Sequence, residues 1–232
     1  KHSYGNLLGI QSEIQNEIKI LLKVWFRKNL YGKVILFVDD IDISFQRGNK
    51  IGLSGGNGTG KSTLLNIATG FLTAEEGAVI LNGDNITHFE AWKLSRLGVK
   101  RTFQKVRFNE ALILKEQLYT SDDIIKRNLH MVEGSGITDY LYSFPNEVPL
   151  PILRKIEVIR ALLNRPKYLF LDEPSAGMAA TDLHDFGEFL KNYIDAETCL
   201  VVVEHRLELM KKIDANICEL RDGKLVNGNI FV

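Results

Sequence analysis

The sequence has few cysteines and no excess of charge of either sign. Its 232 residues include 2 cysteines, and 29 Lys and Arg residues balance 29 Asp and Glu residues. A net charge of zero gives no global attraction to nucleic acid or to anionic lipid, so we expect no nucleic-acid partner. Cys199 and Cys218 lie in apolar segments, which favours buried reduced thiols over a disulfide or a metal site.

Long hydrophobic runs are also missing. No apolar stretch approaches the roughly 18 residues that a membrane-spanning helix needs, and nothing resembles a signal peptide. If the protein acts at a membrane, a different chain or segment must cross it. The 45% hydrophobic and 25% charged residues are ordinary for a soluble globular protein, and the length allows one large domain or two small ones.

The strongest motif is a glycine-rich segment at residues 55–63. It matches the phosphate-binding pattern G-x-x-x-x-G-K-[ST], lies after an apolar stretch and opens a helical run. Glycines let successive backbone N–H groups point at phosphate oxygens, and the helix N-terminus adds its dipole. Lys61 would neutralise the β- and γ-phosphates, and the Ser62 hydroxyl would hold Mg²⁺. The predicted nucleotide-binding residues are Gly55, Gly56, Asn57, Gly58, Thr59, Gly60, Lys61, Ser62 and Thr63.

Two adjacent acids end a wholly apolar segment at residues 168–171. Asp172 is placed to bind Mg²⁺, directly or through water, and Glu173 to polarise an attacking water as general base. Nucleotide binding needs only the first acid, so the second indicates hydrolysis. The sequence therefore predicts binding of a nucleoside triphosphate and its hydrolysis.

The remaining pattern alternates short apolar runs with helical segments. Residues 105–148 are more polar and predict a helical insertion with few strands. Asp222 and Gly223 predict a hairpin turn. Strands are predicted at 18–26, 34–38, 41–45, 50–54, 78–81, 168–171, 200–203, 217–220 and 224–226, and helices at 152–163 and 182–194.

These motifs, in this order, resemble the nucleotide-binding subunit of an ABC transporter. Residues 55–62 resemble its Walker A motif, 101–104 its Q-loop, 168–174 its Walker B motif and 203–205 its switch region. The resemblance implies an α/β P-loop NTPase with a RecA-like core, an antiparallel β subdomain and a helical subdomain at about 105–160. It covers residues 18–232, and residues 1–17 are expected to form a leader or linker.

The resemblance also implies roles for further residues. Gln104 would reach Mg²⁺ and face the transmembrane partner, His205 would contact the γ-phosphate, and Tyr31 would stack on adenine. The implied cofactors are ATP and Mg²⁺, with Glu173, His205, Lys61 and Gln104 catalytic and Ser62, Gln104 and Asp172 at the metal. The implied partners are transmembrane permease subunits and a second cassette. The implied location is cytoplasmic, peripheral on the cytoplasmic face of the membrane. Residues 101–104 and 175–178 resemble the branched-chain amino-acid and lipopolysaccharide-export branch of the family.

One motif of the family is altered. Where the Leu-Ser-Gly-Gly-Gln signature belongs, residues 148–152 read Val-Pro-Leu-Pro-Ile, which lacks the serine hydroxyl and both glycines. Ala179 also stands near a position that is usually aspartate. In this family each ATP lies between one subunit's Walker motifs and the other's signature. We therefore expect an asymmetric heterodimer in preference to a homodimer that tolerates the change. The alternatives from other classes are a soluble, non-transport ABC ATPase and a regulatory ATP sensor.

Overall fold

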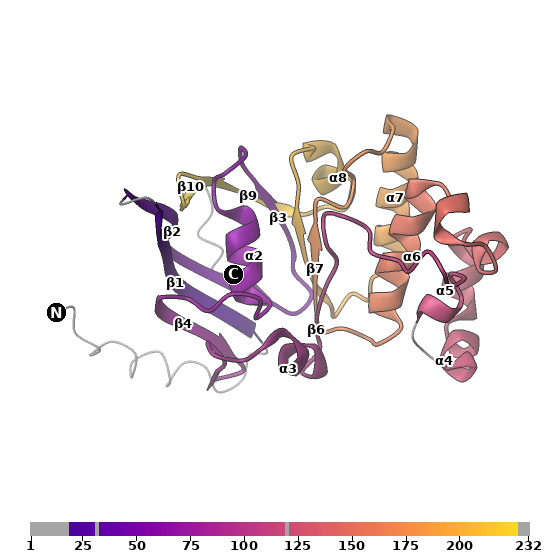
Figure 1. Ribbon diagram of the computed structural model, residues 1–232, viewed down its shortest axis with the longest axis horizontal. Helices are drawn as coiled ribbons and strands as arrows, with labels where there is room; N and C mark the ends of the chain where they lie inside the picture. Colours follow the sequence, from indigo (N-terminus) through magenta and orange to yellow (C-terminus); the bar gives the residue numbers. More distant parts are fainter. Residues whose placement is uncertain (1–18, 31–32, 119–120, 227–232) are drawn as a thin grey trace.

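The computed structural model describes residues 19–30, 33–118 and 121–226. They form two β-sheets, with α-helices between the sheets and on the outer side of the larger one (Figure 1). The predicted residues 1–17 and Tyr31 lie outside the described ranges.

The larger sheet has six strands in the order β10-β9-β3-β8-β7-β6. All its neighbouring pairs are parallel except the β9–β10 hairpin. Every residue of β7 and β8 is buried, as expected for central parallel strands covered on both faces. The strands are β3 (Lys50–Ser54), β6 (Val99–Arg101), β7 (Tyr168–Asp172), β8 (Cys199–Val203), β9 (Asn216–Arg221) and β10 (Lys224–Val226).

The smaller sheet is antiparallel, in the order β2-β1-β4-β5. The predicted strands at 34–38 and 41–45 are one strand here, because β2 pairs with β1 along its whole length, with register shifts around Trp25. This sheet confirms the predicted antiparallel β subdomain. Its strands are β1 (Lys19–Leu30), β2 (Lys33–Gln46), β4 (Glu76–Leu81) and β5 (Asp84–Asn85).

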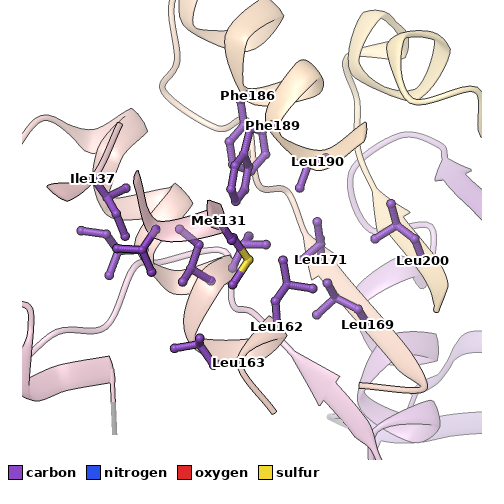
Figure 2. Packing of buried hydrophobic residues seen from close by; sticks show 14 of the residues in the cluster. Met131, Ile137, Leu162, Leu163, Leu169, Leu171, Phe186, Phe189, Leu190 and Leu200 are labelled. Atoms are coloured by element: carbon purple, nitrogen blue, oxygen red, sulfur yellow. The ribbon is translucent and has the colours of Figure 1, made fainter. Parts of the chain in front are cut away.

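Alternating residues of the central strands pack into two separate cores. Tyr168 and Phe170 of β7 face a core that contains α2 (Lys61–Ala68) and strands of both sheets. Leu169 and Leu171 point the other way, toward α6 (Leu150–Leu162), α7 (Ala180–Tyr193) and α8 (Leu207–Lys212), as Figure 2 shows for part of this second core. Helix α2 is thereby held between the two sheets, which positions its N-terminus.

No strand occurs among the described residues between β6 and β7. This agrees with the predicted helical character, but the helices before α6 are short, because the segment is polar and gives only a few buried apolar positions. Helix α6 also begins at Leu150, two residues before the prediction, since Pro151 fits its first turn. The remaining helices are α3 (Ala91–Arg96), η2 (Glu116–Leu118), α4 (Asp122–Arg127), α5 (Leu129–Gly134), η3 (Thr138–Tyr140) and η4 (Pro145–Glu147). Within the described residues, no helix has both the length and the apolar character to cross a membrane.

Candidate nucleotide-binding and hydrolysis site

The phosphate loop connects β3 to α2 in a conformation that needs glycine. Gly55, Gly58 and Gly60 have φ values of 145°, 76° and 101°, in the region that L side chains rarely adopt. A Cβ on Gly55 would lie 2.2 Å from the backbone oxygen of Leu220. The loop is thus pressed against β9, and Gly223 in the β9–β10 turn donates its N–H to the Thr59 oxygen at 3.2 Å.

Lys61 folds back over this loop from the first turn of α2. Its Nζ donates to the carbonyl oxygens of Gly55 at 2.8 Å and Gly56 at 2.7 Å. Burial lowers the pKa of Lys61, while the charges of Glu173 and Asp172 act in the opposite direction. A pocket of about 230 Å³ opens beside the lysine, and its lining consists of Asn57, Gly58, Thr59, Gly60, Lys61, Ser62, Thr63 and Glu173. The predicted loop residues 57–63 and Glu173 therefore border one cavity.

Asp172 is the last residue of β7 and is almost fully buried. Its Oδ2 pairs with the Arg101 guanidinium at 2.7 Å, and Arg101 also donates to Asn66 of α2 at 2.6 Å. The other carboxylate oxygen, Oδ1, is buried with no hydrogen-bond partner among the described residues. An unpaired buried carboxylate oxygen is a costly feature unless a cation or its water shell satisfies it, so Asp172 fits the predicted Mg²⁺ role.

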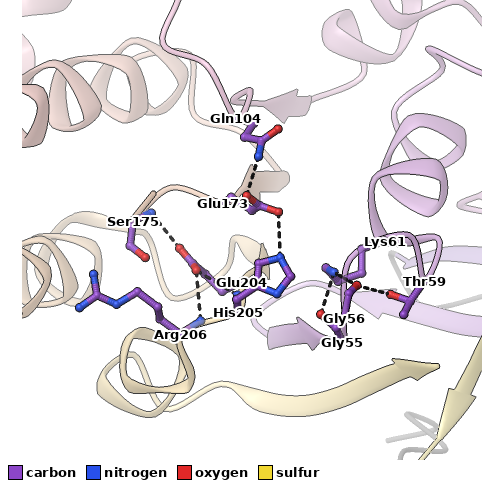
Figure 3. Close-up of polar contacts among 10 residues, drawn as sticks. All are labelled: Gly55, Gly56, Thr59, Lys61, Gln104, Glu173, Ser175, Glu204, His205 and Arg206. Carbon is purple, nitrogen blue, oxygen red and sulfur yellow. Dashed lines mark hydrogen bonds and ion pairs between the residues drawn. The ribbon is translucent and has the colours of Figure 1, made fainter. Parts of the chain in front are cut away.

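Glu173 follows with a φ of 46°, which is strained for a residue with a side chain. Its N–H is bonded to the Val203 oxygen at 2.9 Å, which holds the strained residue beside β8. Its carboxylate is shared by two predicted site residues, as Figure 3 shows. Gln104 Nε2 donates to Oε2 at 2.7 Å, and His205 Nε2 lies 3.2 Å from Oε1. The structure therefore brings Gln104, Glu173 and His205 together from three separate segments.

Three supporting groups were missed in the sequence. Arg101 pairs with Asp172, Glu204 is buried and accepts the backbone N–H of Ser175 at 2.8 Å, and Arg154 on α6 contacts the backbone at Gln104. The available signal was weak: Arg154 and Glu157 form a charged pair among the buried residues of α6, which are otherwise apolar, and buried charges are rare unless paired.

The altered segment at 148–152 forms the entry to α6. Pro149 caps the helix without a side-chain hydrogen bond, Pro151 has no N–H, and the Ile152 N–H is bonded to the Pro149 oxygen at 3.0 Å. The N-terminus of α6 therefore offers few free backbone N–H groups to an anion. Leu150 instead packs toward the loop after Glu173. A Cβ added to Gly177 in that loop would lie 3.0 Å from the Cδ2 of Leu150. Ala179 is the N-cap residue of α7, and its methyl group can neither donate nor accept a hydrogen bond.

A mainly parallel sheet, a glycine loop covered by the Lys61 side chain and two adjacent acids at the end of β7 define a P-loop ATPase. The family model described as ABC transporter matches residues 38–176. The chain belongs to the ABC transporter family and is an ATP-hydrolysing enzyme.

Relatives agree with the predicted branch. The chain is 26% identical over 210 residues to the probable branched-chain amino acid transport ATP-binding protein LivG of Methanocaldococcus jannaschii, covering 82% of each protein. It is 25% identical over 221 residues to the high-affinity branched-chain amino acid transport ATP-binding protein LivG of Escherichia coli, covering 84% of this chain and 86% of that protein. The predicted resemblance to the branched-chain amino-acid type is thereby confirmed.

Solved structures agree with the predicted fold. A nucleotide-free ATP-binding cassette from an ABC transporter superposes with a TM-score of 0.79 at 24% identity, covering 91% of this chain and 90% of that one. A dimeric bacterial ABC transporter cassette gives a TM-score of 0.78 at 19% identity, covering 90% and 96%. The predicted fold of an ABC ATPase cassette is confirmed.

Proposed function

We propose that residues 55–63 bind the phosphates of ATP and that Glu173 acts as general base for the attacking water. The observation that carries the proposal is the position of Glu173, which borders the phosphate-loop pocket and contacts both Gln104 and His205. Lys61 would exchange its two loop carbonyls for phosphate oxygens, and His205 would stabilise charge on the γ-phosphoryl group.

Mg²⁺ is the proposed second cofactor. Ser62, Gln104 and Asp172 would hold it, and its chemistry would be to neutralise charge on the phosphate oxygens. The described residues contain no cluster of three or more His, Cys, Asp or Glu side chains able to hold a metal by themselves. A site that uses one carboxylate, one hydroxyl and substrate phosphates is typical of Mg²⁺, which keeps several waters. The partner-free Oδ1 of Asp172 supports this assignment.

We further propose that the chain works as one half of an asymmetric cassette dimer. Two observations support this proposal. Lys61 and Glu173 border the phosphate-loop pocket, whereas the N-terminus of α6 offers few of the donors with which a signature segment would bind nucleotide. A partner cassette with an intact signature would complete the site at Lys61. The opposite site would hold ATP with little or no turnover. One relative structure is a dimeric cassette, which supports the general arrangement.

The proposed work of this dimer is transport through membrane permease subunits. The relatives are named as transport ATP-binding proteins, which supports a location on the cytoplasmic face of the membrane, held there by the permease. Co-fractionation with membranes tests this part. A chain that stays in the soluble fraction of its native cells would favour a soluble ABC ATPase.

The deciding experiment is steady-state Mg-ATP hydrolysis by the purified chain. Four forms are compared: the wild type, Glu173→Gln, a restored-signature variant, and the restored-signature variant with Glu173→Gln added. The restored-signature variant carries Pro149→Ser, Leu150→Gly, Pro151→Gly and Ile152→Gln. We expect the wild type to bind ATP without turnover and the restored variant to hydrolyse it, because two restored chains complete each other's sites. Adding Glu173→Gln to the restored variant should reduce turnover by about 10²-fold or more.

Other outcomes have definite meanings. Turnover by the wild type alone that disappears in Glu173→Gln would replace the heterodimer with a homodimer that tolerates the altered segment. Turnover that persists in Glu173→Gln would remove Glu173 from its proposed role. Neither outcome changes the family assignment, which rests on the fold and on the sequence match.

A further inference from the structure

Arg154 is a buried arginine that reaches from α6 to the loop containing Gln104. Its side chain is 4% exposed. One terminal nitrogen, Nη1, donates to the Phe103 carbonyl at 2.8 Å, and the other, Nη2, donates to the Gln104 carbonyl in a short hydrogen bond. A guanidinium that holds two consecutive carbonyls fixes the backbone between them, since its donors form a rigid fork.

Glu157, one turn further along α6, completes this arrangement. Its Oε2 lies 3.1 Å from Nη1 of Arg154, and the nearby backbone of Phe103 also favours its charged form. Burial raises the pKa of Glu157, and the charge of Arg154 opposes this change. Buried charges are tolerated when they are paired and hydrogen-bonded, and here both the pair and its bonds are directed at the same loop.

The loop that Arg154 holds, which we call the held loop, carries Gln104 and therefore controls one of the contacts of Glu173. Gln104 is itself exposed, and its side chain is placed on Glu173 Oε2 only if its backbone is held at this position. We propose that Arg154, supported by Glu157, is a positioning residue that sets the Gln104 side chain for its contacts with Glu173 and Mg²⁺.

Arg154 and Glu157 also connect the altered segment, residues 148–152, to the contact between Gln104 and Glu173. Arg154 lies two residues after Ile152, on the helix that residues 148–152 begin, so a shift of that entry would move the loop at Gln104. This extension rests on the proposed function, in which residues 148–152 face the partner's nucleotide. Occupancy of the partner's site would then be sensed at Glu173 of this chain.

Limited trypsin cleavage of the full-length chain tests the positioning without nucleotide. Lys105 and Arg107 are exposed in the held loop, and Lys126 and Arg127 are exposed on α4 as an internal reference. Arg154→Lys keeps the charge but not the fork. We expect it to accelerate cleavage after Lys105 and Arg107 by about tenfold relative to α4, because local opening controls cleavage.

Lys155→Met is the matched control, since Lys155 is the next residue on α6 but donates to Ser135 in the helical region. It should leave the cleavage ratio unchanged. If Arg154→Lys fails to fold, Glu157→Gln preserves volume and weakens the support of Arg154, with a smaller acceleration expected. An unchanged ratio in the folded variants would overturn the proposal.

Binding of a non-hydrolysable ATP analogue, with and without Mg²⁺, separates positioning from a general structural role. We expect Arg154→Lys to reduce the tightening of binding by Mg²⁺ severalfold and to leave Mg²⁺-free binding unchanged. In a Gln104→Ala background, Arg154→Lys should have no further effect. Equal weakening with and without Mg²⁺, or additive effects, would contradict the proposal. Failure of the wild type to bind the analogue would instead contradict the proposed nucleotide site. Trypsin cleavage would still decide the role of Arg154.

Discussion

Glu204 at the end of β8 accepts the backbone N–H of Ser175, which lies 29 residues earlier in the loop after Glu173. The other oxygen of the Glu204 carboxylate accepts the N–H of His205 at 3.1 Å. One buried side chain therefore joins the loop after the Walker acids to the segment that carries the histidine (Figure 3). This contact holds the segment of His205 beside the loop that begins at Glu173.

Replacing Glu204 with Gln should destabilise the protein. The amide keeps one acceptor oxygen but turns an NH₂ group toward backbone donors, and an unsatisfied buried donor costs about 1–3 kcal/mol. The urea midpoint should fall at constant slope. Glu208→Gln is the control, because Glu208 is an exposed residue on α8 and its midpoint should stay near that of the wild type. An unchanged midpoint in Glu204→Gln would contradict the structural role.

Replacing Arg101 with Met should be more severe. The change leaves Asp172 buried without its partner and removes the tie to Asn66 on α2, and breaking a buried ion pair costs about 3–5 kcal/mol. Equilibrium denaturation should show this loss. Arg101→Lys should recover part of it, since an ammonium retains the charge but cannot serve both partners in a fork. A Met variant as stable as the wild type would show that the ion pair contributes nothing.

Two glycines of the phosphate loop should respond differently to alanine. Gly58→Ala adds a Cβ in open space. It should therefore destabilise the protein only because alanine is strained at a φ of 76°, by about 1–2 kcal/mol. Gly55→Ala adds a Cβ only 2.2 Å from a backbone oxygen of β9, so the loop must move. We expect a larger fall in melting temperature and a greater loss of ATP affinity for Gly55→Ala. The reverse order would mean that the loop is not pressed against β9.

The buried thiols predict a loss of stability at alkaline pH. Burial raises the pKa of Cys199 to about 12 and that of Cys218 to about 11, from 9.0. Above pH 9 the unfolded chain therefore binds fewer protons than the folded chain. The free energy of unfolding should fall with rising pH, and the slope should approach about 1.4 kcal/mol per pH unit for each thiol.

Urea denaturation between pH 9 and 10 measures this slope. The double variant Cys199→Ala and Cys218→Ala supplies the comparison. Its stability should depend less on pH than that of the wild type. Tyr168, whose pKa burial also raises from an ordinary value of 10.0, adds to the fall as the pH approaches 10, but it is present in both proteins and cancels in the comparison. Parallel pH profiles for the two proteins would contradict the prediction.

Local patterns predicted most of the central fold. The apolar runs that became β7 and β8 were recognisable because a strand covered on both faces is hydrophobic throughout. The phosphate loop was recognisable because its backbone angles strongly favour glycine. Prediction was poorer at 105–148, where short polar helices give little periodicity. It was also poorer at β2, where Asp39 and Asp40 separate two apolar runs that form one strand in the structure.

The sequence by itself determined the phosphate loop, the two acids at the end of β7 and the altered segment at 148–152, since each depends on residue type at fixed spacing. Only the tertiary structure decided which distant groups meet: Arg101 with Asp172, Arg154 with the carbonyl of Gln104, and Glu204 with Ser175. Partners separated by 71, 50 and 29 residues leave no periodic signal. They are selected by how helices and strands pack, because a buried polar group must find its bond wherever the packing places one.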